Sequence, residues 1–157
     1  MRLPYLAVLL MAMLICCTSI MAQNPPFRPN AKSVDLFRTS FRSAIAKARR
    51  MEVASYRVGF GLQPGEFHEV VEQCLRVGTK EEIKSLLDDV DPVIRVLGLI
   101  CLARLVSPNE FVEFARPLFL DLGTLKYTNG CIVNLSGTVG EIAKALAEGR
   151  FFLVPEK

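Results

Sequence analysis

The chain has 157 residues, of which 19 are Lys or Arg, 16 are Asp or Glu, and one is histidine. Removing the leader predicted below leaves 135 residues and lowers the formal net charge from +3 to +2, because Arg2 is lost. That length is enough for one domain with a single core, and it excludes two such domains. The mean hydropathy of +0.32 is raised by the same leader.

Residues 1–22 are typical of a secretory signal peptide. Arg2 gives a short positive start, residues 6–15 are apolar, and Ala22 is a small residue suited to cleavage before Gln23. Two alternatives stay open. About 20 apolar residues can also span a bilayer as an uncleaved anchor, and Cys16 or Cys17 could carry a lipid, although both sites are poor. The sequence therefore predicts a location outside the cytoplasm, secreted or periplasmic, with membrane anchoring as the alternative.

Residues 23–32 form a proline-rich leader, which we expect to be extended, and residues 33–157 form one domain. Ser33 is suited to cap a helix that runs to about Glu52. Apolar residues recur there at alternating spacings of three and four, as in a helix that docks on another helix. These residues are Val34, Phe37, Phe41, Ala44, Ala48 and Met51.

A basic flank lies beside this apolar seam, formed by Arg38, Arg42 and Arg49. Residues 28–57 hold eight basic and two acidic residues, whereas residues 58–157 hold ten basic and fourteen acidic residues. The flank is therefore interpreted either as packing against the acidic part of the same molecule or as a surface for an acidic protein or anionic lipid. No nucleic acid is expected as a partner.

The glycine-rich stretch at residues 59–65 predicts a turn between two helices. It lacks the Lys-Ser/Thr pair of a phosphate loop, so we expect no nucleotide cofactor there. The next helix is predicted for residues 66–77, ending at Gly78 and carrying the lone histidine, His68, on its surface. Cys74 and Cys101 are expected in the core. The spacing of the cysteines predicts no metal site.

Two helical segments follow within residues 79–106. Thr79 and Glu82 form a capping box at the start of the first segment. Asp91 is suited to cap the second, and Pro92 suits its first helical position. Residues 93–106 have no continuous polar face, because Arg95 and Arg104 fall on opposite sides of the helix. We expect this helix to be enclosed by its neighbours.

This segment resembles the second half of a HEAT-type helical repeat. The resemblance is carried by residues 83–87, Asp91-Pro92, Ile94-Arg95, Gly98, Leu102 and Leu105. It implies an all-α fold, a short right-handed α-solenoid of about six helices, in which Asp91 and Arg95 tie neighbouring repeats together. HEAT repeats imply a stacking and binding scaffold and no reaction.

The C-terminal third repeats these helix starts. Ser107 and Pro108 open a helix that Pro117 should shorten near Glu113. Asn129-Gly130 predicts either a small β-hairpin near residues 124–135 or a packed irregular loop. A third capping box, Thr138 with Glu141, opens the last helix, which ends at Gly149. The apolar residues 151–154 are then expected to cover the edge of the core.

These observations predict a non-catalytic protein-binding or scaffold module outside the cytoplasm, without cofactor or metal. A membrane-surface protein, anchored by an uncleaved leader and using the basic first helix, is one alternative. The other is an enzyme whose site assembles from scattered residues such as His68, Glu69, Glu72 and Asp121.

Overall fold

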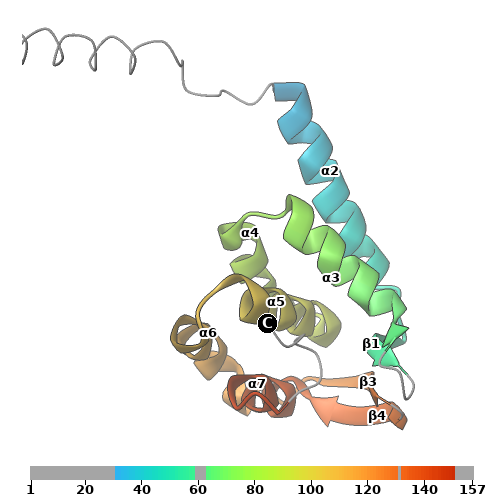
Figure 1. Ribbon diagram of the computed structural model, residues 1–157, viewed down its shortest axis with the longest axis vertical. Coiled ribbons are helices and arrows are strands. Elements are labelled where there is room, and N and C mark those ends of the chain that lie inside the picture. Colours follow the sequence, from blue (N-terminus) through green and yellow to red (C-terminus); the bar gives the residue numbers. More distant parts are fainter. Residues whose placement is uncertain (1–30, 59–62, 131, 151–157) are drawn as a thin grey trace, which may run out of the picture. The chain divides into compact units, whose positions relative to one another are not determined.

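The computed structural model describes residues 31–58, 63–130 and 132–150 (Figure 1). The chain divides into two units, Met1–Val34 and Asp35–Lys157, and the contacts given below lie within the second unit. The predicted signal peptide, most of the predicted leader and the apolar residues 151–154 lie outside the described residues.

The described part is mostly helical, as expected. It contains six α-helices, two short 3-10 helices and four strands. In chain order these are α2 (Ala31–Ala48), β1 (Val53–Val58), β2 (Gln63–Pro64), α3 (Glu66–Val77), α4 (Lys80–Ser85), η1 (Leu86–Asp88), α5 (Pro92–Leu105), α6 (Pro108–Ala115), η2 (Arg116–Leu120), β3 (Thr124–Gly130), β4 (Ile132–Thr138) and α7 (Val139–Ala147).

Helices α4, α5 and α6 start where local capping chemistry predicts. Thr79 accepts a hydrogen bond from the Glu82 backbone N–H, and the Glu82 carboxylate accepts one from the Thr79 backbone. Asp91 Oδ1 accepts a hydrogen bond from the Val93 backbone N–H at 2.9 Å, and Pro92 occupies the first turn of α5. The Ser107 hydroxyl accepts a bond from the Glu110 N–H at the start of α6. These side chains satisfy backbone donors that have no partner within the helix.

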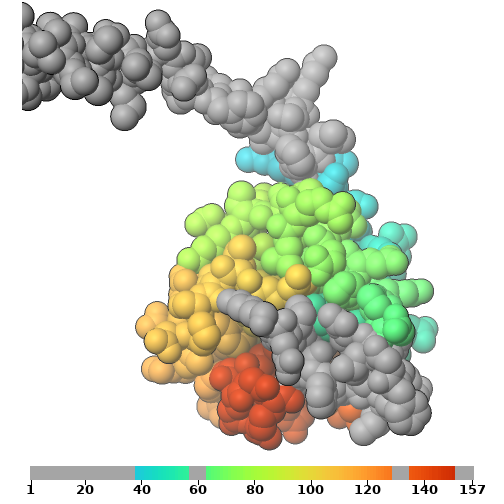
Figure 2. Space-filling model, in the orientation of Figure 1, coloured from blue at the N-terminus to red at the C-terminus, as the bar shows by residue number. Residues whose placement is uncertain are grey.

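Helix α5 is the central element of the core, as its uniform hydrophobicity predicts. Eight of its residues are buried, and it contacts α3, α4, α6 and α7. In Figure 2, the green surface of α3 and α4, the orange surface of α6 and the red surface of α7 lie around the yellow end of α5. Gly98 allows a close approach, because a Cβ there would lie 3.0 Å from side-chain atoms of both Leu86 and Leu87.

The predicted β-hairpin is present, but it belongs to a larger sheet that an all-α fold would lack. Strands β3 and β4 are antiparallel, and β1 pairs with β3 in parallel, giving the order β2-β1-β3-β4. The buried Thr128 hydroxyl of β3 lies 3.3 Å from the Ser55 hydroxyl of β1, within hydrogen-bond distance. The glycine-rich stretch therefore follows a strand, β1, and contains a second one, β2, instead of joining two helices directly.

The first helix differs from its predicted bounds. It begins at Ala31, so Ser33 does not cap it, and it ends at Ala48 rather than near Glu52. Soon after α2 the chain enters β1, which pairs with β3, and this pairing outweighs the local preference for helix. Phe41, Ala44 and Ala48 are buried, which confirms the seam at those positions.

The last two helices end as predicted. Helix α6 stops at Ala115, two residues before Pro117, and the chain continues as a 3-10 helix. Gly149 follows α7 with a φ of 66°, a conformation that favours glycine. In α7 the Thr138 hydroxyl accepts from the Glu141 N–H, and the Glu141 carboxylate accepts from the Thr138 N–H at 2.8 Å.

Replacing Thr138 by alanine is expected to lower the free energy of unfolding by about 1 kcal/mol, because the first turn of α7 then loses its side-chain cap. The matched control is Thr124→Ala, since Thr124 lies opposite Thr138 in the β3–β4 ladder and is exposed. Urea unfolding would measure both variants. Equal losses would show that the cap contributes nothing specific.

The two described cysteines, Cys74 and Cys101, are buried free thiols on α3 and α5, as their core spacing predicts. A hydrogen bond with Cys74, followed by burial, raises the pKa of the Cys101 thiol well above its usual value. Alkylation requires the thiolate and access to it. We therefore expect iodoacetamide to label Cys101 in the unfolded chain at least about tenfold faster than in the folded chain. Peptide mass spectrometry would measure this, and equal rates would contradict it.

Candidate interaction surface at the helix connections

Arg95, in the first turn of α5, joins two connections of the fold. Its Nη1 donates to the Asp89 carbonyl oxygen at 2.6 Å, just before α5. Its Nε and Nη2 lie 2.7 Å and 3.1 Å from the two carboxylate oxygens of Asp121, which follows η2. Both side chains are largely buried, with exposed fractions of 13% and 16%. The Nη2 contact is a hydrogen bond, whereas the Nε contact is an ion-pair approach without hydrogen-bond geometry.

Asp121 is also fixed by its own backbone and its neighbours. Its carboxylate accepts a hydrogen bond from the Gly123 N–H at 2.8 Å. Its carbonyl oxygen accepts another from the Gly140 N–H at 3.0 Å, in the first turn of α7. The connection after η2 is therefore held at both its side chain and its main chain.

Gly123 lets the two connections come into direct contact. A Cβ at this position would lie 2.2 Å from Arg95 Nη2 and 3.2 Å from Pro92 Cγ. Any larger residue would therefore displace the guanidinium from Asp121. The absence of a side chain here is what allows the contact between Arg95 and Asp121 beside the start of α5.

Three large apolar side chains on these two connections face solvent. Val90 is 91% exposed, Leu120 is 85% exposed and Leu122 is 82% exposed. Val90 follows Asp89, and the two leucines flank Asp121, so all three stand on the residues that Arg95 holds together. We call Val90, Leu120 and Leu122 the apolar triad. A single exposed leucine is ordinary, but three on adjacent fixed connections form a candidate contact surface.

A groove of about 620 Å³ lies between the start of α5 and the sheet. One wall is the start of α5 and the other is the sheet. The groove is lined by Glu52, Asp91, Pro92, Val93, Thr124, Leu125, Lys126 and Ser136. In the sequence, Val90 precedes the lining residue Asp91, and Leu122 lies two residues before the lining residue Thr124.

The basic flank predicted on the first helix is only partly available. Arg38 and Arg42 are exposed on α2. Arg49 lies 2.5 Å from the Asp89 carboxylate, in an ion pair between the end of α2 and the connection before α5. Lys47 of the same helix donates to the exposed Glu69 at 2.9 Å and lowers the pKa of that carboxyl. The basic residues Lys47 and Arg49 thus pair with acidic residues of the same chain. This agrees with the interpretation that the basic flank packs within the molecule.

The two predicted repeat positions behave differently. Arg95 does connect successive segments, through Asp89 and Asp121. Asp91 instead caps its own helix, and its backbone N–H donates to Asp89 Oδ1 at 2.9 Å.

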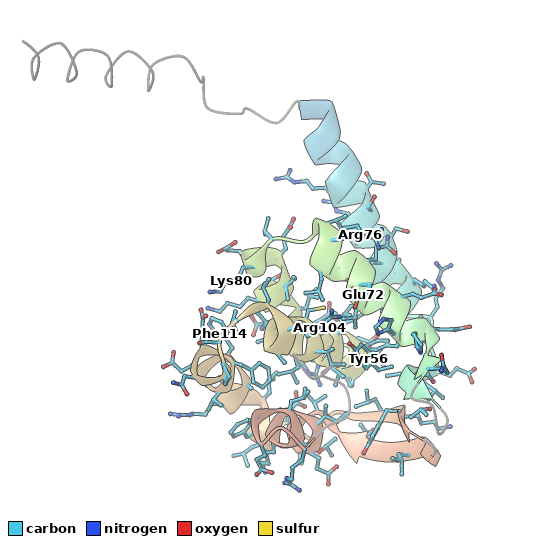
Figure 3. The ribbon with its side chains drawn as sticks, in the orientation of Figure 1. Tyr56, Glu72, Arg76, Lys80, Arg104 and Phe114 are labelled. Carbon is cyan, nitrogen blue, oxygen red and sulfur yellow. The ribbon has the colours of Figure 1, made fainter. Side chains whose placement is uncertain are left out.

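Of the scattered residues weighed as an enzymatic site, His68 and Glu72 lie side by side, whereas Glu69 and Asp121 pair with other residues. His68 lies beside Glu72, with Nε2 3.6 Å from the carboxylate, and its ring is 5.0 Å from the buried Tyr56 ring. Arg104 of α5 forms a hydrogen-bonded ion pair with Glu72 and approaches the Tyr56 hydroxyl at 3.4 Å (Figure 3). Glu69 pairs with Lys47, and Asp121 pairs with Arg95. With a side chain 17% exposed, His68 is also not the surface residue that was expected.

A second, smaller groove of about 230 Å³ lies between α4 with η1 and α6 with η2. Phe114 lies in its wall, with the Lys84 and Lys80 ammonium groups 4.8 Å and 5.6 Å from the ring centroid. Lys80 also pairs with Glu110. These contacts join α4 to α6 and account for the lysines as internal packing.

Sequence reasoning did not identify the apolar triad. Leucine and valine at positions 90, 120 and 122 are ordinary core residues by type, and no periodicity marks them as exposed. The clue available in the sequence was Asp-Leu-Gly at 121–123, an aspartate–glycine turn with an apolar residue between.

Within residues 31–58, 63–130 and 132–150, no helix is long and apolar enough to cross a bilayer. The same described residues contain no group of three or more His, Cys, Asp or Glu side chains placed to hold a metal ion. No protein-family model matches this chain, and no curated protein matches it.

Proposed function

We propose that this chain is an exported, short HEAT-like α-solenoid that binds another protein and catalyses no reaction. The arrangement would consist of three helical pairs, α2 with α3, α4 with α5, and α6 with α7. The connections within these pairs are residues 49–65, η1 with residues 89–91, and η2 with the β3–β4 hairpin. HEAT-type solenoids stack such pairs into a binding scaffold.

The observation that carries this proposal is a chain of arginine–aspartate contacts through the three connections. Arg49, at the end of α2, pairs with Asp89 in the second connection. Arg95, which also donates to the Asp89 carbonyl, pairs with Asp121 in the third. An aspartate and an arginine that tie each repeat to the next are what the HEAT resemblance implies. Here Asp89 takes the tying role expected of Asp91.

The first and last helices of the proposed stack, α2 and α7, carry exposed charged residues. Arg38 and Arg42 are exposed on α2, and Glu141 and Lys144 are exposed on α7. Terminal repeats of solenoid proteins need such polar outer faces for solubility.

Binding rather than catalysis is proposed because the described charged clusters are used internally. Glu72 is engaged by Arg104 and lies beside His68, while Asp121 is engaged by Arg95. Among the described residues, the apolar triad is exposed to solvent, and its side chains supply no acid, base or nucleophile.

Export rests on the sequence of residues 1–22 alone and stays a prediction. The intact mass of the protein recovered outside the cytoplasm tests it, since a cleaved leader predicts a chain beginning at Gln23. Recovery of a chain that retains residues 1–22 would favour the membrane-anchored alternative.

The binding function is tested by cross-linking and affinity purification with the chain from residue 23, under conditions in which circular dichroism confirms its folding. The expected result is one protein recovered in near-stoichiometric amount that also binds after separate purification. The matched control is Leu97→Ala, a core variant that detects capture through unfolding. The proposal is wrong if no purified protein binds the folded chain.

A further inference from the structure

We infer that Cys74 of α3 and Cys101 of α5 form a disulfide when the exported chain folds in an oxidising compartment. The inference rests on the proposed export and adds a covalent link between two neighbouring helical pairs of the proposed stack. The chain from Gln23 has cysteines at positions 74, 101 and 131, so one internal disulfide can form, in any of three pairings. The packing of α3 on α5 favours one of these pairings.

The side chains of Cys74 and Cys101 meet over one turn of α3. Cys101 Sγ lies 3.9 Å from the carbonyl oxygen of Val71, three residues before Cys74 in that helix. A helical side chain points back toward the N-terminus of its helix, so the Cys74 side chain covers the turn that contains Val71. Cys101 also makes a hydrogen bond with Cys74. The two thiols are therefore neighbours across the contact between α3 and α5.

The core holds this pair in place. Cys74 and Cys101 are both fully buried, and each lies on a helix of the same hydrophobic core. Disulfide formation brings the two sulfur atoms to about 2.05 Å from each other. For thiols that already contact one another, this requires a much smaller movement than for cysteines on separate parts of a fold.

The surroundings of the pair do not suit a reactive or metal-binding role. Reactive cysteines are accessible and have a lowered pKa. Here the hydrogen bond with Cys74, followed by burial, raises the pKa of the Cys101 thiol. The described residues place no third His, Cys, Asp or Glu beside the two thiols to complete a metal site. A structural disulfide is the role that two adjacent buried cysteines commonly have in exported proteins.

The bond forms by exchange with a donor disulfide such as oxidised glutathione. The thiolate of one cysteine attacks the donor, which gives a mixed disulfide and releases one donor thiol. The thiolate of the other cysteine then attacks the protein sulfur of the mixed disulfide and releases the second donor thiol. In total, the two cysteines lose two protons and two electrons, and one donor disulfide is reduced to two thiols.

Burial determines when this exchange takes place. In the folded chain the donor cannot reach sulfur atoms that are fully buried between helices. The exchange therefore occurs while the chain is folding, before the core closes around α5. Once formed, the disulfide is protected from reducing thiols by the same burial.

The test refolds the chain from residue 23, which includes all of the described residues, as the variant Cys131→Ser with two thiols left. The reduced, unfolded chain is diluted into about 5 mM reduced and about 0.5 mM oxidised glutathione, a poise close to that of the endoplasmic reticulum. Acid quenching, alkylation in urea and peptide mass spectrometry then identify free and bridged cysteines. At least about nine-tenths of the chains should carry a peptide that joins Cys74 to Cys101.

The matched control is the same variant kept unfolded in urea with the same glutathione buffer. The equilibrium constant for bridging should be at least about tenfold larger in the folded chain, because folding raises the effective concentration of one thiol beside the other. The bridged chain should also unfold at a urea concentration about 1 M higher than the reduced chain. The further variant Cys101→Ala should show no such difference between oxidising and reducing conditions.

Three outcomes reject the inference. The refolded chain could keep both thiols reduced, or the equilibrium constant could be no larger than in urea. In the chain that retains Cys131, most bridges could join Cys131 to Cys74 or to Cys101.

Export and the disulfide can fail separately. The chain recovered from cells is quenched with acid and alkylated in urea in the same way. If it is found outside the cytoplasm with both thiols free, the disulfide is wrong and export stands. If it stays in the cytoplasm, export is wrong, and the glutathione equilibrium still decides whether the fold pairs Cys74 with Cys101.

Discussion

Replacing Arg95 by leucine is expected to lower the free energy of unfolding by about 3 kcal/mol. The change leaves the Asp121 carboxylate largely buried without its cation and removes a donor from the Asp89 carbonyl oxygen. Removing one partner of a buried pair costs more than the pair contributes, because the remaining charge stays desolvated. Urea unfolding followed by circular dichroism would measure the loss.

The control for this prediction is Arg150→Leu. Arg150 pairs with Glu148 just after α7, but both side chains are well exposed, at 70% and 52%. Solvent screens such a pair, so its loss should change the free energy of unfolding by less than about 1 kcal/mol. A similar small change for Arg95→Leu would mean that the connections are not held by this contact, and it would remove the main support for the repeat arrangement.

The second large effect is expected from Leu97→Ala, which should lower the free energy of unfolding by about 3 kcal/mol. Leu97 is fully buried in the middle of α5. Alanine leaves a cavity that the surrounding helices cannot fill, and it keeps the helix propensity nearly unchanged. The measurement is again urea unfolding, with the slope of the transition checked to be unchanged.

Leu105→Ala is the matched change in the same helix, and we expect it to cost less than about 1 kcal/mol, since its side chain is 45% exposed. Comparable losses for the two variants would mean that α5 is not enclosed by its neighbours. The central position of this helix in the fold would then be wrong.

The helix starts could be predicted because they depend on neighbouring residues. Thr79 with Glu82, Asp91 with Pro92, and Thr138 with Glu141 satisfy backbone donors within three residues. Such contacts form with any tertiary arrangement, so the sequence pattern is sufficient to place them. The same holds for the end of α6 before Pro117.

The sheet was predicted only in part, for a different reason. The β3–β4 hairpin was predicted from Asn129-Gly130, a local turn signal. The pairing of β1 with β3 joins residues more than 70 positions apart, such as Val53 and Lys126. Residues 53–58 include strand-forming valine and tyrosine, but nothing in them specifies β3 as the partner strand.

The sequence by itself determined where the helices after α2 begin and end, which residues are apolar on the central helix, and that cysteines 74 and 101 belong to the core. These properties follow from hydrogen bonds and side-chain spacings within one or two turns. Only the tertiary structure decided that Arg95 meets Asp121 and that Arg49 meets Asp89. It also decided that Val90, Leu120 and Leu122 remain in water. Whether a leucine is buried depends on what folds against it, and for these connections that is set by contacts between distant segments.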